Sequence, residues 1–268
     1  MYIIQIPPKN LRNSKKSSTF APAKVKMTPM TILCIETSTQ VCSAAICRDG
    51  ECVEQRISRE DGNHAKLLPI FIDELLQGVR ARGERIDAVA LSEGPGSYTG
   101  LRIGTSTAKG LCYGLNVPLI PVPTLQVLCA AANSQELIAN SLLCPMIDAR
   151  RMEVYTAFYE SELRVESLEF RGERAKAVVV ENEASLNPPP STLNIYYFGD
   201  GAAKCQQVLT SPNWHFVPDL VPEAKYMGRL AEKRMANSQQ LTAQEIAYFE
   251  PFYLKEFVAA PSHVKGLG

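Results

Sequence analysis

The chain has 268 residues, of which 46% are hydrophobic and 21% charged, and basic and acidic side chains are equal in number. This composition is that of a globular protein with room for one large domain or two smaller ones, and no apolar run approaches the about 20 residues that cross a bilayer. Residues 1–27 hold six basic and no acidic side chains, which leaves 22 basic against 28 acidic ones beyond them. Because nucleic-acid affinity comes largely from neutralised phosphates, we expect this acidic body to reach nucleic acid only through a partner.

Residues 1–27 are predicted to be a disordered leader or an extension ahead of the true start, because Met27 and Met30 directly precede the first strand. They lack the apolar core and small-residue cleavage site of a secretory signal. Their acid-free, Ser- and Lys-rich composition also resembles that of an organelle transit peptide, and this alternative stays open. We otherwise expect a cytoplasmic protein.

The eight cysteines contain no CxxC pair and lie mostly in apolar stretches. Cys34, for example, lies within TILCIET, and Cys144 within LLCPMID. The nearby histidines do not complete a zinc-binding spacing. Buried, reduced thiols are therefore predicted, and no metal site.

The first predicted elements are three antiparallel strands at 31–36, 41–48 and 51–57, the last two joined by the turn signal Asp49-Gly50. A helix is predicted over 64–77, with Asn63 as its N-cap. Further along, the chain shows a buried strand at 86–91, a glycine-rich turn, a long helix at 99–115 and an apolar segment at 118–122.

The second half repeats this order with a strand at 141–148 and its predicted hairpin partner at 153–159. A proline-rich loop at 187–191 and a helical stretch near 223–237 follow. The opening strand of each half ends in an acidic residue, Glu36 or Asp148. The pattern predicts two duplicated α/β units.

The segment Ser92–Gly104 (SEGPGSYTGLRIG) has the strongest local pattern. A strand ends, Gly94-Pro95-Gly96 turns, and Ser97 or Thr99 can cap the next helix. Free N–H groups at such a helix start can bind an anion, although a plain tight turn with a capped helix explains the same residues. The segment is not a Walker A loop, because no Gly-Lys-Ser/Thr follows.

The helix that follows contains Gly100, Gly104, Gly110 and Gly114. Each interior glycine costs about 1 kcal/mol relative to alanine, so a close backbone approach is needed to explain them. The two pairs lie one turn apart on the helix. Close packing against another helix, in this chain or in a partner, is the favoured explanation, with phosphate approach at the N-terminal end as the alternative.

The strings ILCIETSTQVCSAAI, NHAKLLPIFIDELL, GPGSYTGLRIG, MIDARRMEVYTAFY and EPFYLKEFVA resemble, in this order, those of the TsaB (YeaZ) family, from about Thr31 to about Ala260. The resemblance implies an α/β fold of the duplicated actin-like ATPase superfamily. It implies an N-terminal subdomain over 28–125, a C-terminal subdomain over 126–262 and a tail at 263–268, and the C-terminal part is expected to fold back on the first subdomain.

The resemblance also implies a function, that of a non-catalytic subunit in tRNA threonylcarbamoyladenosine modification. Its partners would be the transferase TsaD and the ATPase TsaE, tRNA would be contacted only through the complex, and the free chain would form a homodimer. The partner surface would be the helices at 64–77 and 99–115. The interface candidates, for which intramolecular core is the alternative, are Leu68, Phe71, Leu75, Leu101, Gly104, Ala108 and Leu111.

Catalytic relatives in the superfamily bind a metal through HxxxH, but His64 is followed four residues later by Leu68, so no metal is expected. Active members also have Asp where this chain has Glu36. No cofactor is therefore expected beyond weak or vestigial ATP or ADP binding. The residues of such a vestigial site would be Glu36, Thr37, Ser38, Gly94, Gly96, Ser97, Gly199 and Gly201.

Two other classes of function stay open on the sequence. One is an active small-molecule kinase or ATPase of the same fold, which the Glu36 substitution disfavours. The other is a metalloprotease, which the single His64 disfavours.

Overall fold

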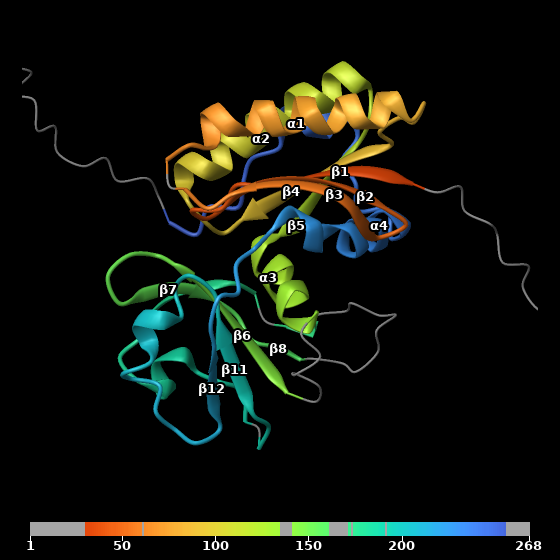
Figure 1. Ribbon diagram of the computed structural model, residues 1–268. Helices are drawn as coiled ribbons and strands as arrows, with labels where there is room; N and C mark the ends of the chain where they lie inside the picture. The colour runs from red at the N-terminus through yellow and green to blue at the C-terminus, as the bar shows by residue number, and fades with distance from the viewer. Residues whose placement is uncertain are drawn as a thin grey trace, which may run out of the picture.

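The computed structural model describes residues 30–60, 62–134, 141–160, 171–172, 174–190 and 192–255. Two sheets, one in each half of the chain, lie one above the other in Figure 1. The strands of the first sheet have the order β3-β2-β1-β4-β5. Their bounds are β1 (Thr31–Glu36), β2 (Cys42–Arg48), β3 (Glu51–Ser58), β4 (Ala88–Gly94) and β5 (Leu119–Pro123).

Two long helices, α1 (His64–Ala81) and α2 (Tyr98–Leu115), lie side by side on the outer face of the first sheet (Figure 1). Their apolar stripes bury side chains such as Leu68, Leu75 and Ala108 against sheet residues such as Leu33 and Ile46. The 3.6-residue period of apolar positions thus places one face of each helix on the core and the other in solvent.

Three segments from later in the chain cover the inner face of the first sheet. They are α3 (Thr124–Asn133), the 3₁₀ turn η3 (Ala224–Met227) and α4 (Gly228–Ala236). Met227 and Leu230 pack there against residues that include Ile32, Cys34 and Ile120. A short helix, α5 (Ala243–Tyr248), then packs beside α2. The C-terminal segment therefore completes the core of the first half.

The second sheet has the order β10-β7-β6-β11-β12, with β8 paired to β6 and β9 paired to β8. Its strands are β6 (Leu142–Asp148), β7 (Glu153–Thr156), β8 (Tyr159–Glu160), β9 (Arg171–Gly172), β10 (Lys176–Val179), β11 (Ile195–Phe198) and β12 (Trp214–Val217). Two 3₁₀ turns, η1 (Glu183–Leu186) and η2 (Ala203–Cys205), lie beside it.

The two sheets share one topology. In each, the opening strand pairs antiparallel with the next strand and parallel with a later one, which in turn pairs parallel with an edge strand. The opening strands end at Glu36 and Asp148. Glycines stand at the ends of the parallel neighbours: Gly94 is the last residue of β4 and Gly199 follows β11, with φ angles of +114° and +111°. The predicted duplication is confirmed.

Helix α3 is buried between the two halves (Figure 1). Val127 and Ala130 face the first sheet, whereas Leu125 and Leu128 pack on the second. A helix with apolar contacts on opposite sides has no amphipathic stripe, which is why its pattern does not stand out in the sequence. The predicted division between residues 125 and 126 falls inside this shared helix.

Most other predicted elements are confirmed with small shifts. Helix α1 continues to Ala81, and Asn63 occupies the N-cap position as predicted, although its side chain makes no capping bond. Its amide donates to Glu60 instead, at 3.2 Å. The predicted strand at 153–159 divides into β7 and β8, and the stretch near 223–237 divides into η3 and α4.

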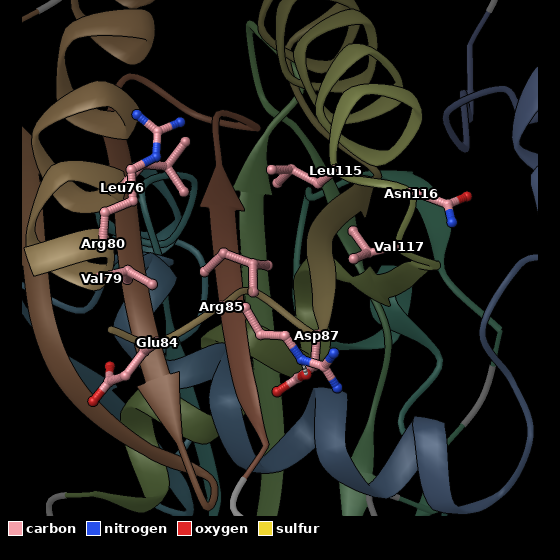
Figure 2. A pocket seen from close by; sticks show the side chains of 10 residues that line it. Leu76, Val79, Arg80, Glu84, Arg85, Asp87, Leu115, Asn116 and Val117 are labelled. Atoms are coloured by element: carbon pink, nitrogen blue, oxygen red, sulfur yellow. Dashed lines mark hydrogen bonds and ion pairs between the residues drawn. The ribbon is translucent and has the colours of Figure 1, made fainter. Parts of the chain in front are cut away.

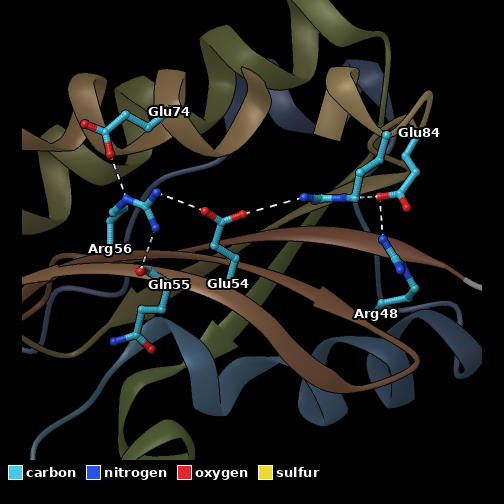
Figure 3. A network of polar contacts seen from close by, with 7 residues as sticks. Arg48, Glu54, Gln55, Arg56, Glu74 and Glu84 are labelled. Atoms are coloured by element: carbon cyan, nitrogen blue, oxygen red, sulfur yellow. Dashed lines mark hydrogen bonds and ion pairs between the residues drawn. The ribbon is translucent and has the colours of Figure 1, made fainter. Parts of the chain in front are cut away.

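A chain of ion pairs connects α1 to the β2–β3 hairpin (Figure 3). Arg56 bridges Glu74 of α1 at 2.7 Å and Glu54 at 2.9 Å. Arg82 contacts Glu54 and Glu84, and Glu84 also pairs with Arg48. Because these side chains are partly exposed, each pair contributes only about 0–1 kcal/mol, and the network mainly orients the helix on the hairpin.

Seven of the eight cysteines are buried, and none forms a disulfide. Cys52 on the edge strand β3 is the exposed one. No helix in the described part of the chain is long and apolar enough to cross a membrane.

Candidate functional site

The loop after β1 is closed within the protein. Glu36, Thr37 and Ser38 have no solvent exposure. The N–H of Ser38 donates to Glu36 Oε1 at 2.6 Å, and the Thr37 hydroxyl donates to the Gly100 carbonyl at 2.8 Å. Glu36 Oε2 has no hydrogen-bond partner among the described residues. This loop anchors the fold and does not open toward a ligand.

The turn after β4 lies directly on that loop. The Gly94–Pro95 peptide is cis. The N–H of Ser97 donates to the Ser38 carbonyl at 2.7 Å, and a Cβ added to Gly96 would lie 2.3 Å from the same oxygen. The Ser97 hydroxyl caps α2 by accepting from the Gly100 N–H at 3.3 Å, as predicted. Two of the backbone N–H groups that an anion would use, those of Ser97 and Gly100, are therefore already bonded within the chain.

The predicted nucleotide-site residues fall into two groups. The structure brings together Glu36, Thr37, Ser38, Gly94, Gly96 and Ser97 in the first half. Gly199 and Gly201 instead lie against the end of β6 in the second half, where the Gly201 N–H donates to the Met146 carbonyl at 3.0 Å. There the Asp148 N–H donates to Asp200 Oδ1, also at 3.0 Å. Nucleotide binding at these residues stays a prediction.

A cavity of about 320 Å³ lies between the two halves at the carboxyl end of β4. Its lining combines Glu93 and Gly94 with Tyr159 and Arg174 of the second half and Phe252 of the C-terminal segment. The Phe252 N–H donates to the Glu93 carbonyl at 2.7 Å, so the tail is fixed at the rim. Burial raises the pKa of Glu93, and Arg234 lowers it in part.

A second cavity, of about 510 Å³, opens between the C-terminal ends of α1 and α2 (Figure 2). Leu76, Val79 and Leu115 form apolar walls, and Arg85 pairs with Asp87 at 3.2 Å across its rim. It lies at the amino ends of β1 and β4, because the Asp87 N–H donates to the Thr31 carbonyl at 2.9 Å. Ligands of open α/β sheets bind at the carboxyl ends of the strands, so the cavity between the halves is the better ligand candidate.

The buried carboxyl of Glu36 makes stability depend on pH. Burial raises the pKa of Glu36, and hydrogen bonds from Ser38 lower it only in part. A carboxyl with a raised pKa keeps its proton longer in the folded state than in the unfolded one. The free energy of unfolding should therefore fall as pH rises from about 4.3 through the folded pKa, by at most about 1.4 kcal/mol per pH unit.

The Glu36→Gln variant should lose this dependence, because the amide keeps an acceptor for the Ser38 N–H but does not ionise. The measurement is urea unfolding of both proteins at pH values from about 4 to 8. The difference between variant and native protein should grow with pH in favour of the variant. A constant difference would show that Glu36 has the same pKa in both states.

Five of the predicted interface residues are part of this chain's own core. Leu68, Leu75, Leu101 and Ala108 are at most 1% exposed, and Gly104 is also buried. They face the sheet because the apolar stripe of each helix is its core stripe. In this conformation these five belong to the intramolecular core, the alternative that the sequence left open, and their role as contact residues stays a prediction. Phe71 and Leu111 are half-buried at the edge of the same cluster.

The glycines of α2 have two different environments. A Cβ on Gly100 would lie 2.0 Å from the Thr37 carbonyl oxygen, and one on Gly104 would lie 2.3 Å from Thr37 Oγ1. The absence of a side chain at these two glycines therefore leaves the space that the loop after β1 occupies. The prediction that they pack against another helix is wrong for these two residues. Around Gly110 and Gly114, no described atom lies within 4 Å of the added Cβ.

The outer face of α2 consists of residues that the sequence prediction did not name as interface candidates, although it named the helix. Its exposed positions repeat at helical spacing and are Thr99, Arg102, Ser106, Gly110, Tyr113 and Gly114. Tyr113 is 92% exposed, and Ile70 on the neighbouring α1 is 46% exposed. The signal was present in the sequence, because the stripe opposite the apolar positions must face outward once the core stripe is assigned.

His64, the lone histidine at the start of α1, is buried in the structure. Its Nε2 lies 2.9 Å from the Thr39 carbonyl oxygen, so the ring holds the loop after β1 against the start of α1. Among the described residues, no group of three or more His, Cys, Asp or Glu side chains could hold a metal ion.

Two copies of one sheet topology, with a buried acidic loop at the end of the first opening strand and a cavity between the halves, define a protein of the duplicated actin-like ATPase fold. A family model, that of TsaD, described as tRNA N6-adenosine threonylcarbamoyltransferase, matches residues 58–262. The tRNA threonylcarbamoyladenosine biosynthesis protein TsaB of Haemophilus influenzae is 32% identical over 235 residues, 87% of this chain and 96% of the relative.

The TsaB protein of Escherichia coli is 30% identical over 86% of this chain and 96% of its own length. Among solved structures, YeaZ from Pseudomonas aeruginosa superposes with a TM-score of 0.70 at 25% identity, covering 84% of this chain and all of that one. The chain belongs to the TsaB (YeaZ) family.

Proposed function

We propose that this chain is a non-catalytic subunit in the biosynthesis of tRNA threonylcarbamoyladenosine, and that the outer face of α1 and α2 docks a TsaD-type partner. Support for the pathway comes from the relatives, which are named as biosynthesis proteins of this modification. A further ATPase, TsaE, would join the pair, and tRNA would be contacted through the assembly. The acidic body of the chain is consistent with indirect contact to tRNA.

The observation that carries the docking surface is the pair of exposed glycines on α2. Gly110 and Gly114 are each expected to destabilise the helix by about 1 kcal/mol relative to alanine. Unlike Gly100, neither is required by a neighbouring atom among the described residues. A helix of a partner could approach the bare backbone at these positions and pack beside the exposed ring of Tyr113. Close approach of this kind is the physical use of small residues one turn apart.

A non-catalytic role is supported by the loops at the strand ends. Glu36 is wholly buried, with its Oε1 bonded to the Ser38 N–H, and so is not placed to activate a ligand. The alternative is a small-molecule kinase or ATPase that uses the cavity between the halves. ATP hydrolysis by the isolated chain, abolished by substitution of Arg174 in that cavity, would favour this alternative.

The variant Gly110→Leu tests the docking surface. It places a large side chain on the exposed face of α2 and does not contact the core. We expect the affinity for TsaD of the same organism to fall at least about 100-fold, equivalent to about 2.7 kcal/mol, in calorimetry and in size-exclusion chromatography with light scattering. The matched control is Gln207→Leu, which adds the same side chain to an exposed site in the second half. Unchanged binding by Gly110→Leu would remove α2 from the interface.

A further inference from the structure

Three thiols lie together on the inner face of the first sheet, one on each of three adjacent strands. They are Cys34 on β1, Cys47 on β2 and Cys52 on β3. Cys34 Sγ lies 3.7 Å from Cys47 Sγ. Cys47 and Cys52 are opposite each other in the antiparallel pairing of β2 with β3, where the register shifts between Ile46 and Cys47. Cys52 is exposed, whereas the other two are buried.

We propose that Cys47 and Cys52 form a reversible cross-strand disulfide by exchange with a low-molecular-weight disulfide such as oxidised glutathione. Residues directly opposite in an antiparallel pair have Cα atoms about 4.5–5.5 Å apart, within the about 4.4–6.8 Å that a disulfide spans. Their side chains also lie on the same face of the sheet. The backbone is therefore already arranged for this bond.

The same geometry disfavours a bond between Cys34 and Cys47, although their sulfurs are close. Cys34 is opposite Ala45, and Cys47 is opposite Ile32, so the two cysteines are diagonal neighbours. Diagonal positions have Cα atoms about 7–8 Å apart, beyond the usual span of a disulfide. Cys34 is thus a neighbour that hydrogen-bonds Cys47, and Cys52 is the residue with which Cys47 forms the disulfide under oxidation.

A soluble disulfide can reach this pair of thiols only at Cys52. Cys52 is on an edge strand and exposed, and it can meet a soluble disulfide. Cys47 is covered by the first residue of α4, since a Cβ on Gly228 would lie 3.0 Å from Cys47 Sγ. Cys52 is therefore the entry thiol and Cys47 the resolving thiol.

The exchange proceeds in two balanced steps. The thiolate of Cys52 attacks one sulfur of oxidised glutathione, which forms a mixed disulfide and releases one glutathione thiolate. The thiolate of Cys47 then attacks the Cys52 sulfur, which forms the cross-strand bond and releases the second glutathione. The protons lost by the two cysteines protonate the two leaving thiolates, so two protein thiols are oxidised and one external disulfide is reduced.

Hydrogen bonding among the thiols slows the reaction at neutral pH. The contact with Cys34 raises the pKa of Cys47, and the contact with Cys47 raises the pKa of Cys52, while nearby Lys225 lowers the pKa of Cys52 slightly. Because the thiolate is the attacking species, the exchange is best followed at about pH 8.5.

The experiment treats the whole protein with oxidised glutathione and counts free thiols before and after dithiothreitol. We expect the thiol count to fall by two from eight and to return on reduction. Trypsin cleaves after Arg48, between the two cysteines, so the bond should hold together two peptides that otherwise separate in mass spectrometry. The variant Cys52→Ser should show no linked peptides, whereas Cys34→Ala should still lose two thiols.

Glutathione that stays on Cys52, linked peptides that disappear in the Cys34→Ala variant, or an unchanged thiol count would each overturn the proposal. Because Cys52 is exposed, its serine variant should keep the native melting temperature, and this check separates chemistry from misfolding.

Discussion

Replacing Gly100 with alanine should lower the free energy of unfolding by about 3 kcal/mol or more, because the new methyl group has no space. Its carbon would lie 2.0 Å from the Thr37 carbonyl oxygen, which belongs to a fully buried loop. The backbone at Thr37 cannot move away from the new methyl group as the end of a flexible side chain could. The loop after β1 and the start of α2 would have to separate, and the bond from the Thr37 hydroxyl to the Gly100 carbonyl would be strained.

The matched control is Gly110→Ala in the same helix. Here the added methyl group meets no described atom within 4 Å, so only the helix propensity changes. We expect stabilisation by up to about 1 kcal/mol. Denaturant unfolding followed by circular dichroism measures both variants. If Gly100→Ala were as stable as Gly110→Ala, the close approach of α2 to the loop after β1 would be absent in solution.

These two glycines also show what the sequence could and could not predict. The cost of glycine in a helix correctly indicated that some backbone approaches α2 closely. The spacing of the glycines could not identify the neighbour, which for Gly100 is a loop more than 60 residues earlier in the chain, at Thr37. Periodicity likewise located both helices, but an apolar stripe does not reveal whether the core beneath it belongs to the same chain.

The fold was predictable where the local pattern was clear. The strand at β1, the Asp49-Gly50 turn and the repeat of the second half followed from β-propensity and turn residues. Helix α3 was missed, because its two apolar sides serve two sheets. The same helix explains why a boundary placed at residue 125 divides a structural element and not a linker.

The candidate site was only partly predictable. The resemblance grouped the loops after β1 and β4 with Gly199 and Gly201 in one site. The structure brings only the first two loops together, where Gly96 packs directly on Ser38. The cavity between the halves depends on Tyr159, Arg174 and Phe252, which meet only through the tertiary fold. No spacing in the chain relates these three residues.

The packing of the C-terminal segment on the first sheet predicts a second large effect, for Leu230→Ala. Leu230 of α4 is 3% exposed and packs with Met227 on the inner face of that sheet. Truncating a buried leucine removes its transfer free energy and leaves a cavity, so unfolding should become easier by about 2–5 kcal/mol. The neighbouring Arg229→Ala removes a partly exposed ion pair with Glu51 and should cost about 1 kcal/mol at most.

The single tryptophan makes this prediction informative about the organisation of the chain. Trp214 lies in β12 and is buried in the core of the second half, so its fluorescence reports on that half. Circular dichroism reports on both. Because α3 contributes to both cores, we expect Leu230→Ala to shift the two signals together, as one cooperative transition. A shift confined to circular dichroism would mean that the first half, together with η3 and α4, unfolds independently of the second half. The packing of α3 on both sheets would then not make their unfolding cooperative.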